Sequence, residues 1–238
     1  MPPSPTEWRS LQGTLSLGDN DIHIWRAKLD CAPETLNKFS GYLSPDEREK
    51  SASFYFEVHR NHYVAGRGIL RALLSHYLGK PPADFAFAYS DFGKPSLATD
   101  LHFNLSHSHG LALYAFSIQH QLGVDVEKIR PELAGPEIAE RFFSPAEAEV
   151  VKASGPDAFF RCWTRKEAFL KAHGKGLSLP LNKFTVDVGE NARLLEVEFD
   201  PSEMGRWSLY SIQPGTGYEG ALAVEGTNHQ LSFWEWLA

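Results

Sequence analysis

Two periodicities of apolar and polar positions run along this chain. Between about 157 and 173 the apolar residues recur at every third or fourth position, which predicts an amphipathic helix. Gly174 and Gly176 follow it and are typical of a helix end. The same helical spacing predicts a second long helix over about 59–78.

Short alternating or β-branched runs predict strands between these helices. The expected strands lie at 21–29, 85–89, 111–117, 121–129, 184–188, 194–199, 207–212 and 221–224. Strands and helices do not alternate strictly, so an α+β fold with small antiparallel sheets is favoured over a parallel doubly wound sheet. No apolar run approaches the roughly 18 residues that span a bilayer, so we expect no membrane segment.

The chain shows an internal repeat, called the echo here, in which similar residues recur at positions whose numbers differ by 100. The paired positions are Ile22 and Leu122, Ile24 and Val124, Lys28 and Lys128, Ser44-Pro45 and Ser144-Pro145, Glu47 and Glu147, and Arg71 and Lys171. Ser-Pro is a common helix start, because serine caps the helix and proline suits its first turn. Several matches at one offset predict duplication into a pseudo-two-fold pair of similar subdomains, residues 1–119 and 120–238. A ligand site is expected at their interface.

Composition narrows the class of function. The net charge of −7 argues against nonspecific nucleic-acid binding. Only Cys31 and Cys162 occur, without CxxC spacing, and no signal-like leader is visible, so we expect a cytoplasmic protein. No feature calls for an oligomer, and a monomer is expected.

Three carboxylates distinguish the second copy from the first. Asp125 and Glu127 are two apart on a predicted strand and therefore project to the same side. One interpretation is a solvated edge strand with Lys128 and Arg130 as partners. The other is a hard divalent cation, most simply Mg²⁺, held by this pair together with Glu167 on the helix. Lys171 lies one helical turn beyond Glu167, on the same face.

Polar residues also cluster in two segments of the first half. Residues 91–95 form a turn by composition, and Lys94 in it is expected to be exposed to a phosphate or to water. Residues 102–110, HFNLSHSHG, place Ser106 beside His107 just before a predicted strand. A nucleophilic serine is disfavoured, because the GxSxG motif is missing and neighbouring side chains on a strand point apart. Hydrogen bonding to phosphate oxygens fits this pair better. Arg60, Arg67 and Arg71, which fall close to one face of the predicted helix, could add positive charge, although a solvated face is equally open for Arg60.

The segments FNLSHS, GVDVE, RFFSPAE and FFRCWTRKEAFLKAHGKGLSL together resemble the 4′-phosphopantetheinyl transferases of the surfactin-synthetase-associated type. The resemblance implies a pseudo-two-fold α+β fold, in agreement with the echo. It also implies a Mg²⁺-dependent transfer of the 4′-phosphopantetheine arm of coenzyme A to a serine of an apo acyl or peptidyl carrier protein. Adenosine 3′,5′-bisphosphate would be released.

The resemblance also suggests roles for particular residues. Asp125, Glu127 and Glu167 are similar to the family's metal ligands, and Glu167 to its general base. The expected contacts to coenzyme A come from Lys171 and His107 at the pyrophosphate, Ser106 near the 3′-phosphate, Gly93, Lys94 and Pro95 at the adenine and ribose, and Lys50 near the 3′-phosphate. Glu47 stands where some members have a second lysine, so Arg60 or His62 is expected to replace it.

Two other functions remain open on the sequence. A noncatalytic module could hold coenzyme A or a carrier protein, although pure binding would not require three carboxylates. A Mg²⁺-dependent phosphodiesterase would instead release the arm as a free product.

Overall fold

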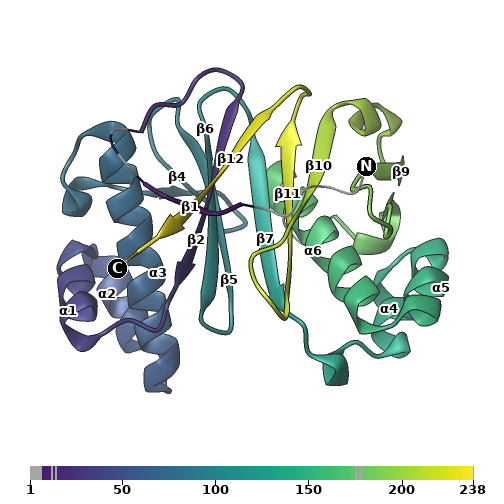
Figure 1. Ribbon diagram of the computed structural model, residues 1–238, viewed down its shortest axis with the longest axis horizontal. Helices are drawn as coiled ribbons and strands as arrows, with labels where there is room; N and C mark the ends of the chain where they lie inside the picture. Colours follow the sequence, from purple (N-terminus) through teal and green to yellow (C-terminus); the bar gives the residue numbers. More distant parts are fainter. Residues whose placement is uncertain (1–6, 12, 14, 175, 177–178, 238) are drawn as a thin grey trace.

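The computed structural model describes residues 7–11, 13, 15–174, 176 and 179–237. Two β-sheets pack against each other in the centre, and helices cover the outer face of each sheet, which gives four layers (Figure 1). An apolar cluster that includes Ile24, Leu113, Val124 and Leu222 fills the space between the sheets. The expected pseudo-two-fold α+β architecture is confirmed.

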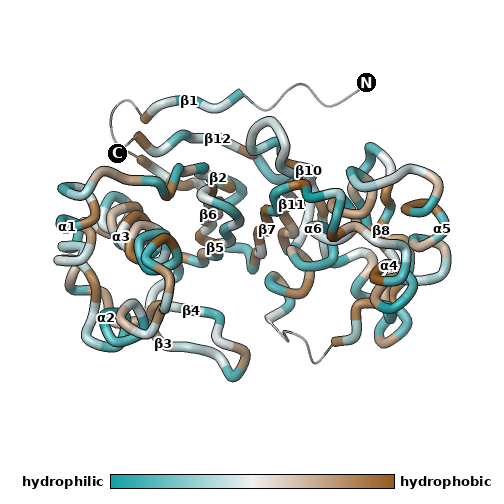
Figure 2. The backbone as a smooth tube through the Cα atoms, turned by 90° about the horizontal axis from the view of Figure 1, so that it is seen from below, coloured by the Kyte–Doolittle hydropathy of each residue, from teal (hydrophilic) through white to brown (hydrophobic). Residues whose placement is uncertain are grey.

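The first half combines a five-stranded sheet with three helices. The sheet has the order β1-β12-β2-β6-β5. Its strands are β1 (Arg9–Ser10), β2 (Asp21–Lys28), β5 (His102–Ser108), β6 (Leu111–Ser117) and β12 (Gln230–Trp236). The helices are α1 (Pro33–Tyr42), α2 (Pro45–Ala52) and α3 (Glu57–Leu78). A short 3-10 turn at Pro82–Asp84 leads to the hairpin of β3 (Ala88–Tyr89) and β4 (Pro95–Ser96), which extends toward the second half (Figure 2).

The second half repeats this plan with a smaller sheet. Its antiparallel strands have the order β10-β11-β7 and span Trp207–Ile212, Tyr218–Glu225 and Leu122–Lys128. Its helices are α4 (Pro136–Phe142), α5 (Pro145–Ser154) and α6 (Pro156–His173). A separate hairpin contains β8 (Phe184–Val186) and β9 (Leu194–Val197), and 3-10 turns occur at Pro131–Leu133, Leu181–Lys183 and Pro201–Gly205. No described helix combines the length and apolar character needed to cross a bilayer.

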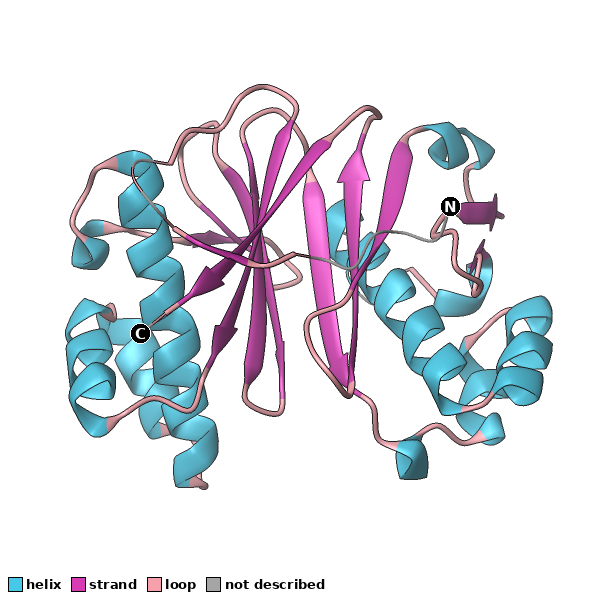
Figure 3. Cartoon of the chain, viewed as in Figure 1, coloured by secondary structure: helices cyan, strands magenta, loops and turns pink. Residues whose placement is uncertain are grey.

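Strand β12 crosses from the second half back into the first. It lies beside β2 in the central sheet (Figure 3) and pairs with it in parallel. Its Trp234 stacks on Trp25, with ring centroids 5.8 Å apart. The sheet that we expected to be antiparallel is therefore mixed. Strand β12, which follows the predicted boundary at residues 119 and 120, thus belongs to the sheet of the first half.

The echo of Ser-Pro motifs corresponds to two equivalent capped helices. The backbone N–H of Ser44 donates to Glu47 Oε2 at 3.0 Å, and that of Ser144 donates to Glu147 Oε2 at 2.7 Å. Such caps satisfy N–H groups that have no partner within the helix. Both glutamates are only 1% exposed, so each needs a buried cation.

Different cations pair with the two glutamates. Glu47 accepts from Arg67 Nε at 2.5 Å and from Arg71 Nε at 2.7 Å. Glu147 lies 2.8 Å from the ammonium of Lys166. Glu47 is therefore a buried structural group whose charge is paired within the first half.

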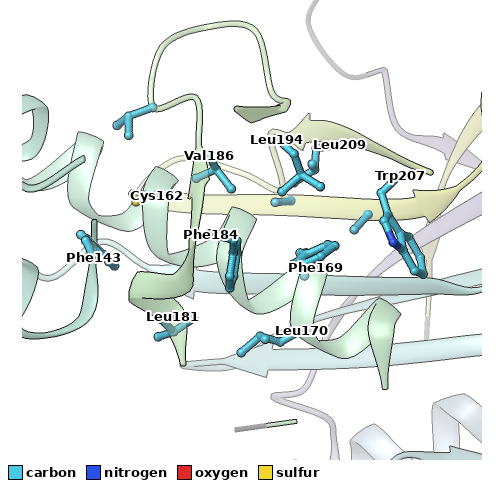
Figure 4. Close-up of a cluster of buried hydrophobic side chains, with 14 of the residues drawn as sticks. Phe143, Cys162, Phe169, Leu170, Leu181, Phe184, Val186, Leu194, Trp207 and Leu209 are labelled. Atoms are coloured by element: carbon cyan, nitrogen blue, oxygen red, sulfur yellow. The ribbon is translucent and has the colours of Figure 1, made fainter. Parts of the chain in front are cut away.

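Helix α6 supplies much of the core of the second half. Its apolar side chains pack with those of β8, β9 and β10, and Phe169 lies between Phe184 and Trp207 (Figure 4). The amphipathic pattern at 157–173 correctly predicted this helix. Because one face is held by these contacts, the residues on its other edge are fixed relative to β7.

Candidate active site

The two sheets meet where β5 runs beside β7 without a backbone ladder between them. Asn104 Oδ1 accepts from the backbone N–H of Val124 at 2.9 Å, and Ser108 Oγ accepts from that of Lys128 at 3.2 Å. Every second side chain of β5 faces this seam, and Asn104, Ser106 and Ser108 are all buried. The polar segment that we expected to precede a strand is thus itself a strand, whose polar side chains join the two halves.

Helix α6 lies directly on β7 because Gly123 has no side chain. A Cβ at this position would stand 2.8 Å from the carbonyl carbon of Lys171 and would clash with the backbone of Ala168 and Ala172. This close approach brings the edge of α6 that bears Glu167 and Lys171 next to the carboxylates of β7. The glycine in GVDVE is the sequence signal for that approach.

A lysine, a serine and an aspartate form a buried network at the seam. Lys171 Nζ donates to Asp125 Oδ1 at 2.6 Å and to Ser106 Oγ at 2.9 Å. Ser106 Oγ in turn donates to the same Asp125 oxygen at 2.8 Å. Ser106, which the resemblance associated with the 3′-phosphate, is therefore engaged beside the carboxylates. The second oxygen of Asp125 is buried and has no hydrogen-bond partner among the described residues.

The ionised forms of the other two carboxylates, Glu127 and Glu167, are disfavoured by their surroundings. Burial, and secondarily the charge of Asp125, raises the pKa of Glu167 above its usual value. Burial also raises the pKa of Glu127, and Asp125 adds to this effect although Ser108 donates a hydrogen bond to Glu127 at 2.7 Å. Like charges held in a partly buried place favour binding of a cation.

All three carboxylates line one open pocket of about 930 Å³ between the halves. The first half contributes Ser106 and His107 to it. The second half contributes Asp125, Glu127, Arg141, Phe142, Trp163, Glu167, Lys171 and residues 179–182. Two further hollows of about 530 Å³ and 220 Å³ share lining residues with each other, and each also shares lining residues with the first. The three hollows therefore adjoin one another along the seam, which suits an elongated ligand.

The carboxylates provide ligands suited to Mg²⁺, which prefers oxygen donors. The unpartnered Asp125 oxygen and the raised pKa values of Glu127 and Glu167 are features that suit binding of a cation. Within the described part of the chain, however, no three His, Cys, Asp or Glu side chains are gathered as a ready-made metal cluster. Two of the carboxylates are engaged within the protein: Lys171 Nζ lies 2.6 Å from Asp125 Oδ1, and Ser108 Oγ donates to Glu127 Oε2 at 2.7 Å.

His107 lies between the pocket with the carboxylates and the 530 Å³ hollow. Burial, and then the positive charges of Lys171 and His62, lowers its pKa. A histidine whose pKa falls below about 6.5 is mainly neutral at pH 7. Neutral His107 can therefore offer a hydrogen bond but no full charge, and contacts of Lys171 and His107 with a pyrophosphate stay a prediction.

The turn at 91–95 differs from the expectation. Lys94 is not directed to solvent: its Nζ donates to the carbonyl oxygens of Leu122 at 3.0 Å and Lys171 at 2.8 Å. Gly93 and Pro95 line the two smaller hollows, and Gly93 has a positive φ of 79°. The turn thus borders the site, while the Lys94 ammonium is bound to backbone.

The candidate basic residues are not all at the site. Lys50 is exposed and lines the 530 Å³ hollow together with His62 and Arg67. Arg60 lines none of these three pockets. His62, its suggested companion, is 2.7 Å from Asp30. Arg67, which the sequence offered together with Arg60 as a source of positive charge, does line the 530 Å³ hollow.

Apolar residues of the large pocket were also missed. Trp163 stacks on Phe159 and, with Phe142, forms a wall one helical turn from Glu167. Leu179 and Leu181 extend this wall. In the sequence Trp163 was read only as part of the apolar stripe of α6, because a helical pattern does not show which edge of the stripe borders a pocket.

A two-lobed α+β protein with an acidic pocket between its lobes is the class that this fold and site define. A family model described as the 4′-phosphopantetheinyl transferase superfamily matches residues 121–224, and another, 4′-phosphopantetheinyl transferase, N-terminal, matches residues 28–119. The chain is 37% identical to the 4′-phosphopantetheinyl transferase HetI of Nostoc sp., over 96% of this chain and 98% of HetI. It is 33% identical to Sfp of Bacillus subtilis, over 76% and 83% of the two chains.

A more distant match is the L-aminoadipate-semialdehyde dehydrogenase-phosphopantetheinyl transferase of Mus musculus, with 27% identity over 79% of this chain and 70% of that protein. This chain belongs to the 4′-phosphopantetheinyl transferase family, of the Sfp type. Its activity is the transfer of 4′-phosphopantetheine from coenzyme A to carrier proteins.

Proposed function

We propose that this chain performs the transfer in the pocket lined by Asp125, Glu127 and Glu167, with Mg²⁺ as its cofactor. The acceptor is a serine hydroxyl of an apo acyl or peptidyl carrier protein. The observation that supports this most is the junction itself, where Lys171, Ser106 and Asp125 from both halves meet in one hydrogen-bonded network. The three carboxylates would hold the cation, and its charge would offset negative charge on the pyrophosphate.

The reaction forms one P–O bond and breaks another. The carrier serine oxygen bonds to the phosphorus nearest the pantetheine, and the bond from that phosphorus to the bridging oxygen breaks. Adenosine 3′,5′-bisphosphate leaves with the bonding electrons. The hydroxyl proton must be accepted by a base.

The chain's own residues meet these needs. Glu167 accepts the proton, since its carboxylate lines the pocket beside Asp125. Lys171 supplies positive charge to the pyrophosphate, and neutral His107 supplies a hydrogen bond. Asp125 and Ser106 hold the Lys171 ammonium in place before the substrate arrives.

The test incubates the protein with coenzyme A, Mg²⁺ and a panel of apo carrier proteins, and then determines the carrier mass. Gain of the phosphopantetheine mass in the wild type supports the proposal, and Asp125→Ala and Glu167→Gln should abolish it. Glu149→Gln, at an exposed position on α5, is the matched control and should transfer normally. Normal transfer by either site variant would overturn the assignment.

A further inference from the structure

The ammonium of Lys94 joins three elements from the two halves. It extends from the turn before β4 and donates to the Leu122 carbonyl on β7 at 3.0 Å and to the Lys171 carbonyl on α6 at 2.8 Å. The hairpin of β3 and β4 that carries it reaches across the seam (Figure 2). One side chain of the first half therefore binds two backbone segments of the second.

The Lys171 carbonyl that Lys94 binds belongs to the last turn of α6, where a cation stabilises a helix. The last four carbonyls of a helix have no N–H partner within it, and their partial negative charge favours a nearby cation. Helix α6 ends at His173, and the N–H of Gly174 donates to the Leu170 carbonyl at 3.0 Å. Lys94 thus acts on the same final turn that the Gly174 cap closes.

The turn before β4 is closed by its own hydrogen bonds. Ser90 Oγ accepts from the backbone N–H of Lys94 at 3.1 Å, and the Ser90 N–H donates to the Lys94 carbonyl at 3.0 Å. The N–H of Gly93 donates to the Ser90 carbonyl at 2.8 Å. Such a turn presents the lysine stem from a fixed base.

Lys94 binds the backbone carbonyl of Lys171, and the side chain of Lys171 lines the site. Lys171 Nζ reaches Asp125 Oδ1 at 2.6 Å, and β7 carries both Leu122 and Asp125. A shift of the last turn of α6 would separate the Lys171 ammonium from Asp125.

We propose that Lys94 is a positioning residue, which holds the end of α6 against β7 so that Lys171 is aligned with Asp125. This inference rests on the proposed role of Lys171 at the pyrophosphate. It differs from the role that the sequence suggested for Lys94, since the side chain acts on the backbone of the enzyme and not on coenzyme A.

Kinetics separate the two roles. Lys94→Met keeps most of the stem but removes the charged donor. For a positioning residue, kcat should fall roughly tenfold, the scale of one charge-assisted hydrogen bond, while KM for coenzyme A stays unchanged. Lys94→Arg, which retains a charged donor, should recover part of kcat. A higher KM with unchanged kcat would show that Lys94 binds coenzyme A and would overturn the proposal.

Hydrogen exchange tests the same contact without substrate. In the ligand-free protein, Lys94→Met should accelerate exchange of amides in the last turn of α6, including that of Gly174, and Lys152→Met on exposed α5 should not. Unchanged exchange would overturn the proposal. If the Lys94→Met protein does not fold, Lys94→Gln provides the same comparison. If the wild-type protein transferred no phosphopantetheine, the proposed function would be wrong. Hydrogen exchange would still test the contact between Lys94 and α6.

Discussion

Gly123 on β7 and Ala168 on α6 lie in backbone contact, with no room for even a methyl group between them. The same contact places Glu167, the next residue back along α6, at the pocket with Asp125. Packing of the second half and assembly of its acidic site are therefore one event.

Gly123→Ala should impair both folding and transfer. The added methyl group must displace α6, and overpacking of this kind costs about 1–3 kcal/mol of unfolding free energy. Denaturant unfolding and the mass assay measure the two effects. Gly41→Ala on α1, where a methyl group meets nothing within 4 Å, is the control and should leave stability equal or slightly higher. A Gly123→Ala protein as stable and active as Gly41→Ala would contradict the described contact.

Glu127→Gln and Glu167→Gln should each raise the melting temperature of the metal-free protein at pH 7. Both glutamates have a raised pKa in the folded state, so their ionisation opposes folding above that pKa. The pKa of a glutamate in the unfolded chain is about 4.3. As the pH falls through the folded-state pKa toward this value, the wild type should regain the stability that ionisation costs, and the variants should not. Thermal unfolding from pH 7 to pH 5 measures the difference, with Glu149→Gln as control.

The same two variants should respond less to Mg²⁺. If the carboxylates bind the ion, added Mg²⁺ stabilises wild type by mass action and raises its melting temperature. Variants that lack one ligand should show a smaller rise. An equal rise in wild type and in both variants would place the ion elsewhere.

Lys171→Met should have the opposite effect on stability. Asp125 is 3% exposed, and the substitution removes the cation bound to it, so the protein should lose about 1–3 kcal/mol. Transfer should fall by roughly 100-fold or more, because a charge aimed at the pyrophosphate is lost. Stability and kcat together test this, and stabilisation by Lys171→Met would contradict the network.

Glu47→Gln should destabilise the first half without improving affinity for coenzyme A. Burial opposes ionisation of Glu47, but Arg67 and Arg71 outweigh it and lower its pKa. Breaking such a buried ion pair costs about 3–5 kcal/mol. The ionised Glu47 stabilises the folded state above the pKa that Glu47 has in the unfolded chain. This stabilisation is lost as the pH falls through the lowered pKa of the folded state. The stability of Glu47→Gln should therefore depend less on pH in the acid range. Glu49→Gln, exposed on the same helix, is the control. Tighter binding of coenzyme A by Glu47→Gln would contradict a purely structural role for Glu47.

Local patterns predicted the parts of this molecule that local interactions determine. The helix at 156–173 follows from its apolar spacing, and Asp125 and Glu127 share a side of β7 because strand residues alternate. Strand β5 was missed because the partners of Asn104 and Ser108 lie some 20 residues away on another sheet.

Long-range contacts also explain the other differences. The charge on Lys94 suggested solvent, but its two acceptors are carbonyls at positions 122 and 171. Burial lowers the pKa of Lys94 to about 8, which no sequence pattern indicates. The strand expected at 85–89 is reduced to Ala88–Tyr89, whereas those at 111–117 and 207–212 have the expected bounds.

Strand β12 has a consequence for how the protein is made. The central sheet of the first half receives its parallel neighbour only when residues 230–236 have left the ribosome, long after β2 has been synthesised. Until then one edge of β2 remains open to other chains. Two fragments divided at residue 119 should therefore need each other to fold, and a chaperone that shields this edge during synthesis would raise the yield of folded protein.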